Sequence, residues 1–474
     1  MFSKEGKLFL HLTLFAALIG LSGCATYQQQ NKFAPYYASS DLTMAEREAR
    51  KKADDKENGK DAIIWRLEAA TILRAAEKFD DSNKAFDQAE LHIDKFAEEA
   101  KVKVASETGA LFSNQAELPY RGRCYDGIML STYKALNFLQ LNDADKARVE
   151  LNRAYERQKD AVEENKKRIE KTEEEVAKHK NREQIEKARD DSKLKGQIDT
   201  SCSDLERLKI YSDYVNPFTV YLDGLFSMAQ ASGPSDLERA RKSFERALSC
   251  AEDNKFVRQD LETVEALSQG KALSPTTYVI FETGRAPVRD QIRIDIPIIF
   301  SKVSYVGAAF PKLTMQGNYL PALQVCGGGA TENTALVASM DSIVGSDFKN
   351  ELPTIITKTI ASTVVKAAAS YVVNDATTKK NGSSGDAVAA IFMRLGTAIY
   401  QAAVNIADLR TWTTLPKEIQ VCRIPTPADR KITLSGSGGA SKREVNVAEG
   451  TVNVVFVKSI SNTGPLLVSQ FKLK

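Results

Sequence analysis

The 474-residue chain contains little histidine, little cysteine and almost no net charge. Only His11, His92 and His179 occur, and the sequence has neither an HExxH nor a CxxC motif. It therefore lacks the signatures of zinc proteases and of thioredoxin-like redox proteins. The 65 Lys and Arg residues nearly balance the 62 Asp and Glu residues, so the cationic field typical of a nucleic-acid-binding protein is absent. The 43% hydrophobic and 27% charged content predicts a globular fold and excludes a polytopic membrane protein.

The N-terminus has the pattern of an export signal. Two lysines precede an apolar run over residues 8–21, which is too short for a spanning helix. The run ends at Leu21-Ser22-Gly23-Cys24, which resembles the lipobox of bacterial lipoproteins. This resemblance implies that residues 1–23 are a signal peptide and that Cys24 is acylated, which would anchor the chain in a bilayer. The alternative is an ordinary secretory signal followed by a chance cysteine.

The residue after the acylated cysteine bears on location. In diderm bacteria, a lipoprotein with Ala25 rather than an aspartate at this position is sorted by default to the outer membrane, where it faces the periplasm. Residues 24–60 are polar and charged, and we expect them to form the lipid anchor and a tether that ends in a short helix.

Residues 61–270 show helical periodicity throughout. Small and large apolar residues recur at helix-turn-helix offsets around Phe86, Leu151 and Phe244. These offsets are similar to the tetratricopeptide (TPR) pattern, in which small residues let paired helices approach closely. The three anchors are 65 and 93 residues apart, so inserted helices must separate the units. The sequence predicts a TPR-like helical domain, with a generic helical bundle as the alternative.

The most charged stretch of this region is 156–195. It has 13 Lys and Arg residues and 12 Asp and Glu residues among 40, which predicts a long, solvated helical arm held by ion pairs between residues four apart. We expect His179 in this arm to face solvent. A more specific alternative is that the arm projects from the fold and binds another protein.

Near residue 274 the spacing of apolar residues changes from a helical to a strand-like pattern. Residues 274–474 are therefore expected to form an α+β domain. Helices are predicted at 347–374 and 385–407, and together they would make a helical hairpin. Lys358 and Lys366 lie inside the apolar part of the first helix, and their cost in a bilayer excludes a spanning segment. Short apolar or alternating runs predict strands at 278–281, 291–298, 302–308, 321–326, 332–339, 418–424, 429–434, 443–447 and 451–458.

Five residues beside predicted strand ends are candidates for a site: Glu282, Arg285, Asp408, Arg410 and Trp412. One interpretation is a buried ion pair that joins the sheet to the hairpin. The other is a recognition surface in which the two arginines and the tryptophan hold a carboxylate-bearing or glycan partner. No catalytic residue, metal site or cofactor site is predicted.

Five cysteines follow Cys24, and their odd number leaves at least one thiol free unless a partner supplies its mate. We interpret each as a small structural hydrophobe, although the domain assignment permits a Cys326–Cys422 disulfide. The remaining three are Cys124, Cys202 and Cys250.

The lipobox, the TPR-like half, Phe281–Pro287 and Ala407–Pro416 together resemble a family of poorly characterised Gram-negative outer-membrane lipoproteins. The resemblance implies no active site. It suggests a role near lipoproteins that activate penicillin-binding proteins, so that the partner would belong to the peptidoglycan-synthesis machinery. We therefore predict a non-enzymatic interaction scaffold or accessory factor in cell-envelope biogenesis. The alternatives are an envelope glycan hydrolase with paired carboxylates and a subunit of a larger periplasmic complex.

Overall fold

The computed structural model describes residues 27–55, 59–102, 115–209, 211, 214–297, 305–378, 406–436 and 441–474. Its architecture is α+β, as the sequence predicts. Cys24 and the signal peptide lie outside the described residues, as does nearly all of the second helix predicted for the hairpin.

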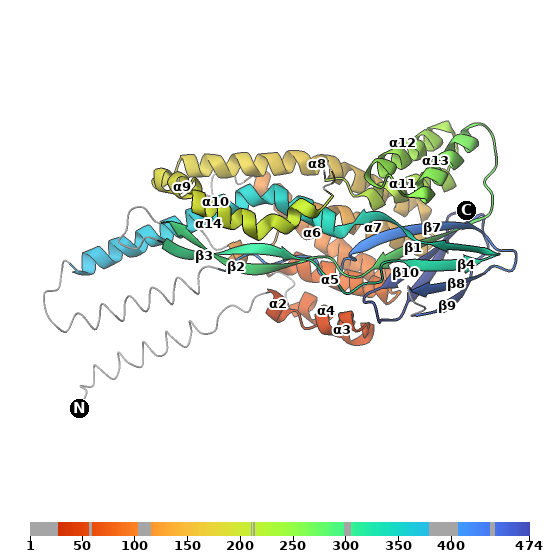
Figure 1. Cartoon of the computed structure of the whole chain (residues 1–474), viewed down its shortest axis with the longest axis horizontal. Coiled ribbons are helices and arrows are strands. Elements are labelled where there is room, and N and C mark those ends of the chain that lie inside the picture. Colours follow the sequence, from red (N-terminus) through yellow and green to blue (C-terminus); the bar gives the residue numbers. More distant parts are fainter. Residues whose placement is uncertain are drawn as a thin grey trace, which may run out of the picture.

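The helical half consists largely of antiparallel helix pairs joined by short turns (Figure 1). Asp143 and Asn216 begin two of these helices, because each side chain accepts hydrogen bonds from backbone amides of the first turn. The helices at the three predicted anchors are present. Their bounds are α5 (Ala62–Ala75), α6 (Phe79–Val102), α7 (Cys124–Gln140), α8 (Ala144–Ala177), α11 (Pro217–Ala229), α12 (Pro234–Cys250) and α13 (Lys255–Ser268).

The first described residues do not form the predicted tether. They fold into three helices, α2 (Tyr27–Gln30), α3 (Ala34–Ala38) and α4 (Leu42–Asp55). Tyr27, Phe33 and Tyr37 are buried, and the ring of Tyr27 lies 4.7 Å from that of Trp65 in α5. These aromatic contacts could not be predicted from the sequence, because the segment as a whole is polar and charged. The described part of the fold therefore begins at Tyr27, three residues after Cys24.

The predicted charged arm is helical, but it is neither a single helix nor fully solvated. After α8 the chain turns back through α9 (Arg182–Arg189) and α10 (Ser192–Cys202). One apolar face of these helices packs on α14 (Met340–Thr378) and on the ribbon of β2 (Val288–Pro297) and β3 (Tyr305–Thr314). His179 is half-buried rather than exposed, and its Nδ1 accepts a hydrogen bond from the backbone amide of Asn181.

The second half contains three sheets. A five-stranded sheet has the order β11-β10-β1-β7-β6, in which β1 and β10 are parallel and the other pairs are antiparallel. A four-stranded sheet has the order β5-β4-β8-β9, and β2 and β3 form the third. Strand β11 was not predicted from the sequence. The bounds are β1 (Thr276–Thr283), β4 (Leu323–Gly327), β5 (Ala330–Asn333), β6 (Ala335–Ser339), β7 (Glu418–Pro425), β8 (Lys431–Gly436), β9 (Arg443–Asn446), β10 (Val452–Ser459) and β11 (Leu467–Lys472).

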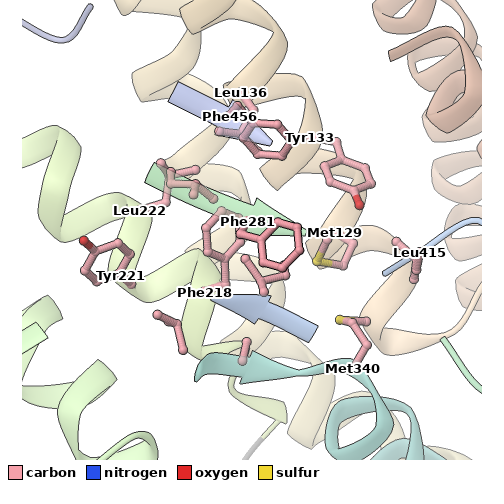
Figure 2. Packing of buried hydrophobic residues seen from close by; sticks show 14 of the residues in the cluster. Met129, Tyr133, Leu136, Phe218, Tyr221, Leu222, Phe281, Met340, Leu415 and Phe456 are labelled. Atoms are coloured by element: carbon pink, nitrogen blue, oxygen red, sulfur yellow. The ribbon is translucent and has the colours of Figure 1, made fainter. Parts of the chain in front are cut away.

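The two predicted domains, 61–270 and 274–474, share one hydrophobic core. Figure 2 shows Tyr133 and Leu136 of α7 and Phe218 of α11 packed around Phe281 of β1 and Phe456 of β10. Strand β1 is buried along its whole length, which explains its continuous apolar run. The helices thus cover one face of the five-stranded sheet. Within the described ranges, no helix is both long and apolar enough to cross a membrane.

Candidate functional site

Three of the five predicted site residues lie in a segment that crosses the helical half. Residues 406–416, called the strap below, precede β7 and contain neither helix nor strand. Trp412 at its centre is fully buried, and its Nε1 donates to Thr71 Oγ1 at 2.9 Å. The Trp412 ring lies 5.9 Å from each of the Phe86 and Tyr133 rings. Trp412 is thus an anchor inside the protein, not part of an exposed recognition surface.

Glu68 of α5 holds the next residues of the strap. Its carboxylate accepts hydrogen bonds from the backbone amides of Thr413 at 2.7 Å and Thr414 at 3.0 Å. The Thr413 hydroxyl and the Tyr27 hydroxyl donate to the same carboxylate, at 2.7 and 2.5 Å. Burial raises the pKa of Glu68, although these donors oppose the rise. Glu68 therefore ties the strap and α2 to α5.

Arg410 joins the start of the strap to the helical half. Its Nε donates to Asp408 at 2.7 Å, and its Nη1 donates to Asp61 at 3.0 Å. The guanidinium also donates to the backbone oxygens of Leu118 and Gln115. Burial would raise the pKa of the Asp408 carboxyl, but the charge of Arg410 outweighs burial, and the pKa of Asp408 is lowered. The ion pair links the strap to α5, not the sheet to the hairpin.

Glu282 and Arg285 lie apart from the strap residues. Glu282 of β1 is buried and accepts a hydrogen bond from Lys458 Nζ at 2.6 Å, across neighbouring parallel strands. Burial would lower the pKa of Lys458, but Glu282 raises it. Arg285 is half-buried and has no ion-pair partner within the described part of the chain. Of the residues predicted to grip a partner, only Arg285 is not already held by interior contacts.

A second buried ion cluster was not predicted from the sequence. Glu351 of α14 accepts hydrogen bonds from Arg123, from Arg289 at 2.7 Å and from Arg168 at 3.0 Å. Arg123 also donates to the backbone oxygen of Arg410 at 3.2 Å, which connects this cluster to the strap. The only sequence signal was the pair of carboxylates, Asp347 and Glu351, spaced by four residues in α14.

The other carboxylate of this cluster, Asp347, is buried with both oxygens lacking a hydrogen-bond partner among the described residues. Burial raises the pKa of Asp347, and the negative charge of Glu351 raises it further. Burial would also raise the pKa of Glu351, but the three arginines outweigh burial and lower it. Burial also raises the pKa of the nearby Cys124 thiol. Because a thiolate is the reactive form, Cys124 is not an activated nucleophile.

Two small hollows lie beside candidate residues. They hold about 20 and 30 Å³ of free volume, room for roughly one water molecule each. Glu282 lines one hollow, and Asp408 and Arg410 line the other. Asp347 and Glu351 are too deeply buried to act on a glycan. Among the residues that the structure covers, no group of three His, Cys, Asp or Glu side chains could hold a metal ion.

The five cysteines after Cys24 are all free thiols. Cys326 and Cys422, for which the sequence permitted a disulfide, lie in different sheets, in β4 and β7. Cys422 is buried, and the other four are half-buried.

Comparisons with protein-family models, with curated proteins and with solved structures find no match for this chain. The predicted membership of a lipoprotein family therefore stays a prediction.

Proposed function

We propose that this chain is a lipid-anchored lipoprotein of the outer membrane that faces the periplasm and acts as a non-enzymatic scaffold in cell-envelope biogenesis. The observation that carries the proposal is the Leu21–Cys24 lipobox at the end of the apolar run. Acylation there would hold the protein at a membrane through several acyl chains, each contributing about 0.8 kcal/mol per buried methylene.

The scaffold part of the proposal includes a TPR-like arrangement of the helix pairs. Its support is the close packing of α11 on α12, where a Cβ on Gly224 would lie 2.9 Å from the Phe244 ring. Close contact between a small residue of one helix and a large residue of the next is typical of TPR repeats.

Exposed apolar residues indicate where a protein partner would bind. The large hydrophobic side chains that are exposed in the described residues are Leu91, Val149, Tyr155, Val162 and Leu336. The first four lie on α6 and α8, which are joined by the ion pair between Arg157 and Glu90. Four of the five exposed large apolar side chains thus lie on two helices that an ion pair connects. We therefore assign the partner surface to α6 and α8.

The anchor is tested by labelling cells with radioactive palmitate and by fractionating their envelopes. We expect label on the wild-type chain and none on Cys24→Ala, and we expect the variant to leave the membrane fraction. An unlabelled wild-type chain, or a variant that stays attached to envelopes, would contradict the proposal.

The partner surface is tested by crosslinking in intact cells followed by purification of the chain. Leu91→Ser combined with Tyr155→Ser should abolish crosslinks to a specific envelope protein. Leu336→Ser is the matched control, because Leu336 is similarly exposed but lies on β6. Clearing of a peptidoglycan gel by the purified protein would instead support the hydrolase alternative.

A further inference from the structure

We propose that one face of the protein rests on the lipid headgroups of the bilayer. This face, called the anchor face below, surrounds the buried Tyr27 and is formed by Lys32, Lys60, Glu117 and Asp408. The inference rests on the proposed acylation of Cys24 and goes beyond it, because it states which side of the folded body meets the membrane.

The first argument is the length of chain between the lipid and the fold. Tyr27 is fixed in the body, since its side chain is 5% exposed, its hydroxyl donates to Glu68 and its ring packs on Trp65. Three residue steps separate the Cα atoms of Cys24 and Tyr27, and they span at most about 11 Å when fully extended. A body held this closely cannot turn the surface around Tyr27 away from the bilayer.

The second argument is the chemistry of the surface around Tyr27. The hollow beside Tyr27 is lined by Lys60, Asp61, Glu117 and Asp408. Lys60 and Glu117 form an ion pair at 2.7 Å, and their side chains are 35% and 45% exposed. Lys32 is exposed nearby in sequence. Paired charges of this kind suit the polar headgroup layer, which is about 5–7 Å thick in each leaflet, rather than the hydrocarbon core.

The orientation has a consequence for partner binding. In Figure 1, α2 lies at the lower side of the molecule, whereas α8 and α12 lie at the upper side. An anchor face on the membrane therefore leaves α8 directed away from the bilayer. The surface that we assign to a protein partner would then be open to the periplasm.

The test measures the depth of two labelled positions in liposomes. The full-length, acylated chain is reconstituted with lipids that carry a nitroxide on the headgroup, after a fluorophore is attached at Lys32→Cys or at Lys242→Cys. Lys242 is the matched control, because it is an exposed lysine of α12. The parent chain, labelled in parallel, supplies the background from the five other cysteines. We expect quenching at position 32 to be at least threefold stronger than at position 242.

A linker variant tests whether the short connection is the cause. Fifteen Gly and Ser residues inserted after Ala25 add a mean span of about 20 Å, which should bring quenching at position 32 down to the level at position 242. Equal quenching at the two positions of an acylated, liposome-bound chain overturns the orientation but leaves the anchor intact. A linker without effect overturns the argument that the short connection sets the orientation. A chain whose Cys24 carries no lipid by mass spectrometry overturns the proposed function and this inference together.

Discussion

Replacing Arg410 by alanine should destabilise the protein far more than replacing Arg285, although both arginines were candidates for the same site. The Arg410 side chain is 5% exposed, and it donates hydrogen bonds to Asp61, Asp408 and two backbone carbonyls. Arg285 is half-buried and forms no ion pair within the described residues. The two substitutions therefore separate a structural from a recognition role.

The magnitude follows from what Arg410→Ala leaves behind. Removing one member of a buried ion pair costs about 3–5 kcal/mol, mainly because the partner charge stays buried without compensation. Asp61 and Asp408 have side chains 12% and 23% exposed, and Arg123 lies 3.7 Å from Asp408. Water and Arg123 thus offset part of the loss, so we expect about 3 kcal/mol for Arg410→Ala. Arg285→Ala should cost no more than about 0.5 kcal/mol.

Urea unfolding followed by tryptophan fluorescence is a direct assay, because Trp412 lies two residues from Arg410. Both variants should be compared with the wild type at one pH and one salt concentration. A loss below 1 kcal/mol for Arg410→Ala, or equal losses for the two variants, would refute the structural interpretation. If such a stable Arg410→Ala chain also lost its crosslinked partner, Arg410 would belong to a recognition site.

Three further predictions concern packing, pH and the strap. Gly224→Ala should lower the melting temperature, because the added Cβ meets Phe244 and overpacking costs about 1–3 kcal/mol. Gly196→Ala in α10 should raise the melting temperature, because the added Cβ enters open space and alanine favours a helix over glycine. Burial raises the pKa of Asp260 to about 6 from 3.8. The folded state then retains a proton that the unfolded chain releases, so stability from this group is present below about pH 4 and lost as the pH rises through 6. In urea titrations from pH 4 to 7, the wild type should lose up to about 3 kcal/mol of stability that Asp260→Asn does not lose. The variant also carries a cost that does not change with pH, because it removes the carboxylate that pairs with Arg423 at 2.6 Å. Glu68→Ala should cost about 3 kcal/mol in the same assay, because it leaves two strap amides unsatisfied; a loss below 1 kcal/mol would contradict this role.

Local patterns predicted most of the regular structure. The alternating isoleucines at 292, 294 and 296 identified β2, and the apolar run at 278–281 identified β1. Strand β11 was not predicted, because Leu467–Lys472 is an edge strand in which only Phe471 is buried. Neither a continuous apolar run nor a clean alternation marks such a strand.

Long-range contacts account for the errors. The charged arm contains few large apolar residues, among them Val176, Ile185 and Leu194, and too few to indicate a buried face. The residues on which they pack come from β2, β3 and α14. Arg410 and Trp412 were recognised as unusual, but their partners Asp61 and Thr71 are more than 300 residues away in sequence. Spacing along the chain carries no information about such pairs.

The strap limits where a partner can bind the helical array. In the proposed TPR-like array, an extended peptide would be expected to lie against the helices, but Trp412 and its neighbours already occupy the surface formed by α5 and α7. A peptide that displaced them would expose Trp412 and leave Glu68 and Asp61 buried without their donors, at a cost of several kcal/mol. A partner that binds the folded chain must therefore use its outer surface, where α6 and α8 present Leu91 and Tyr155.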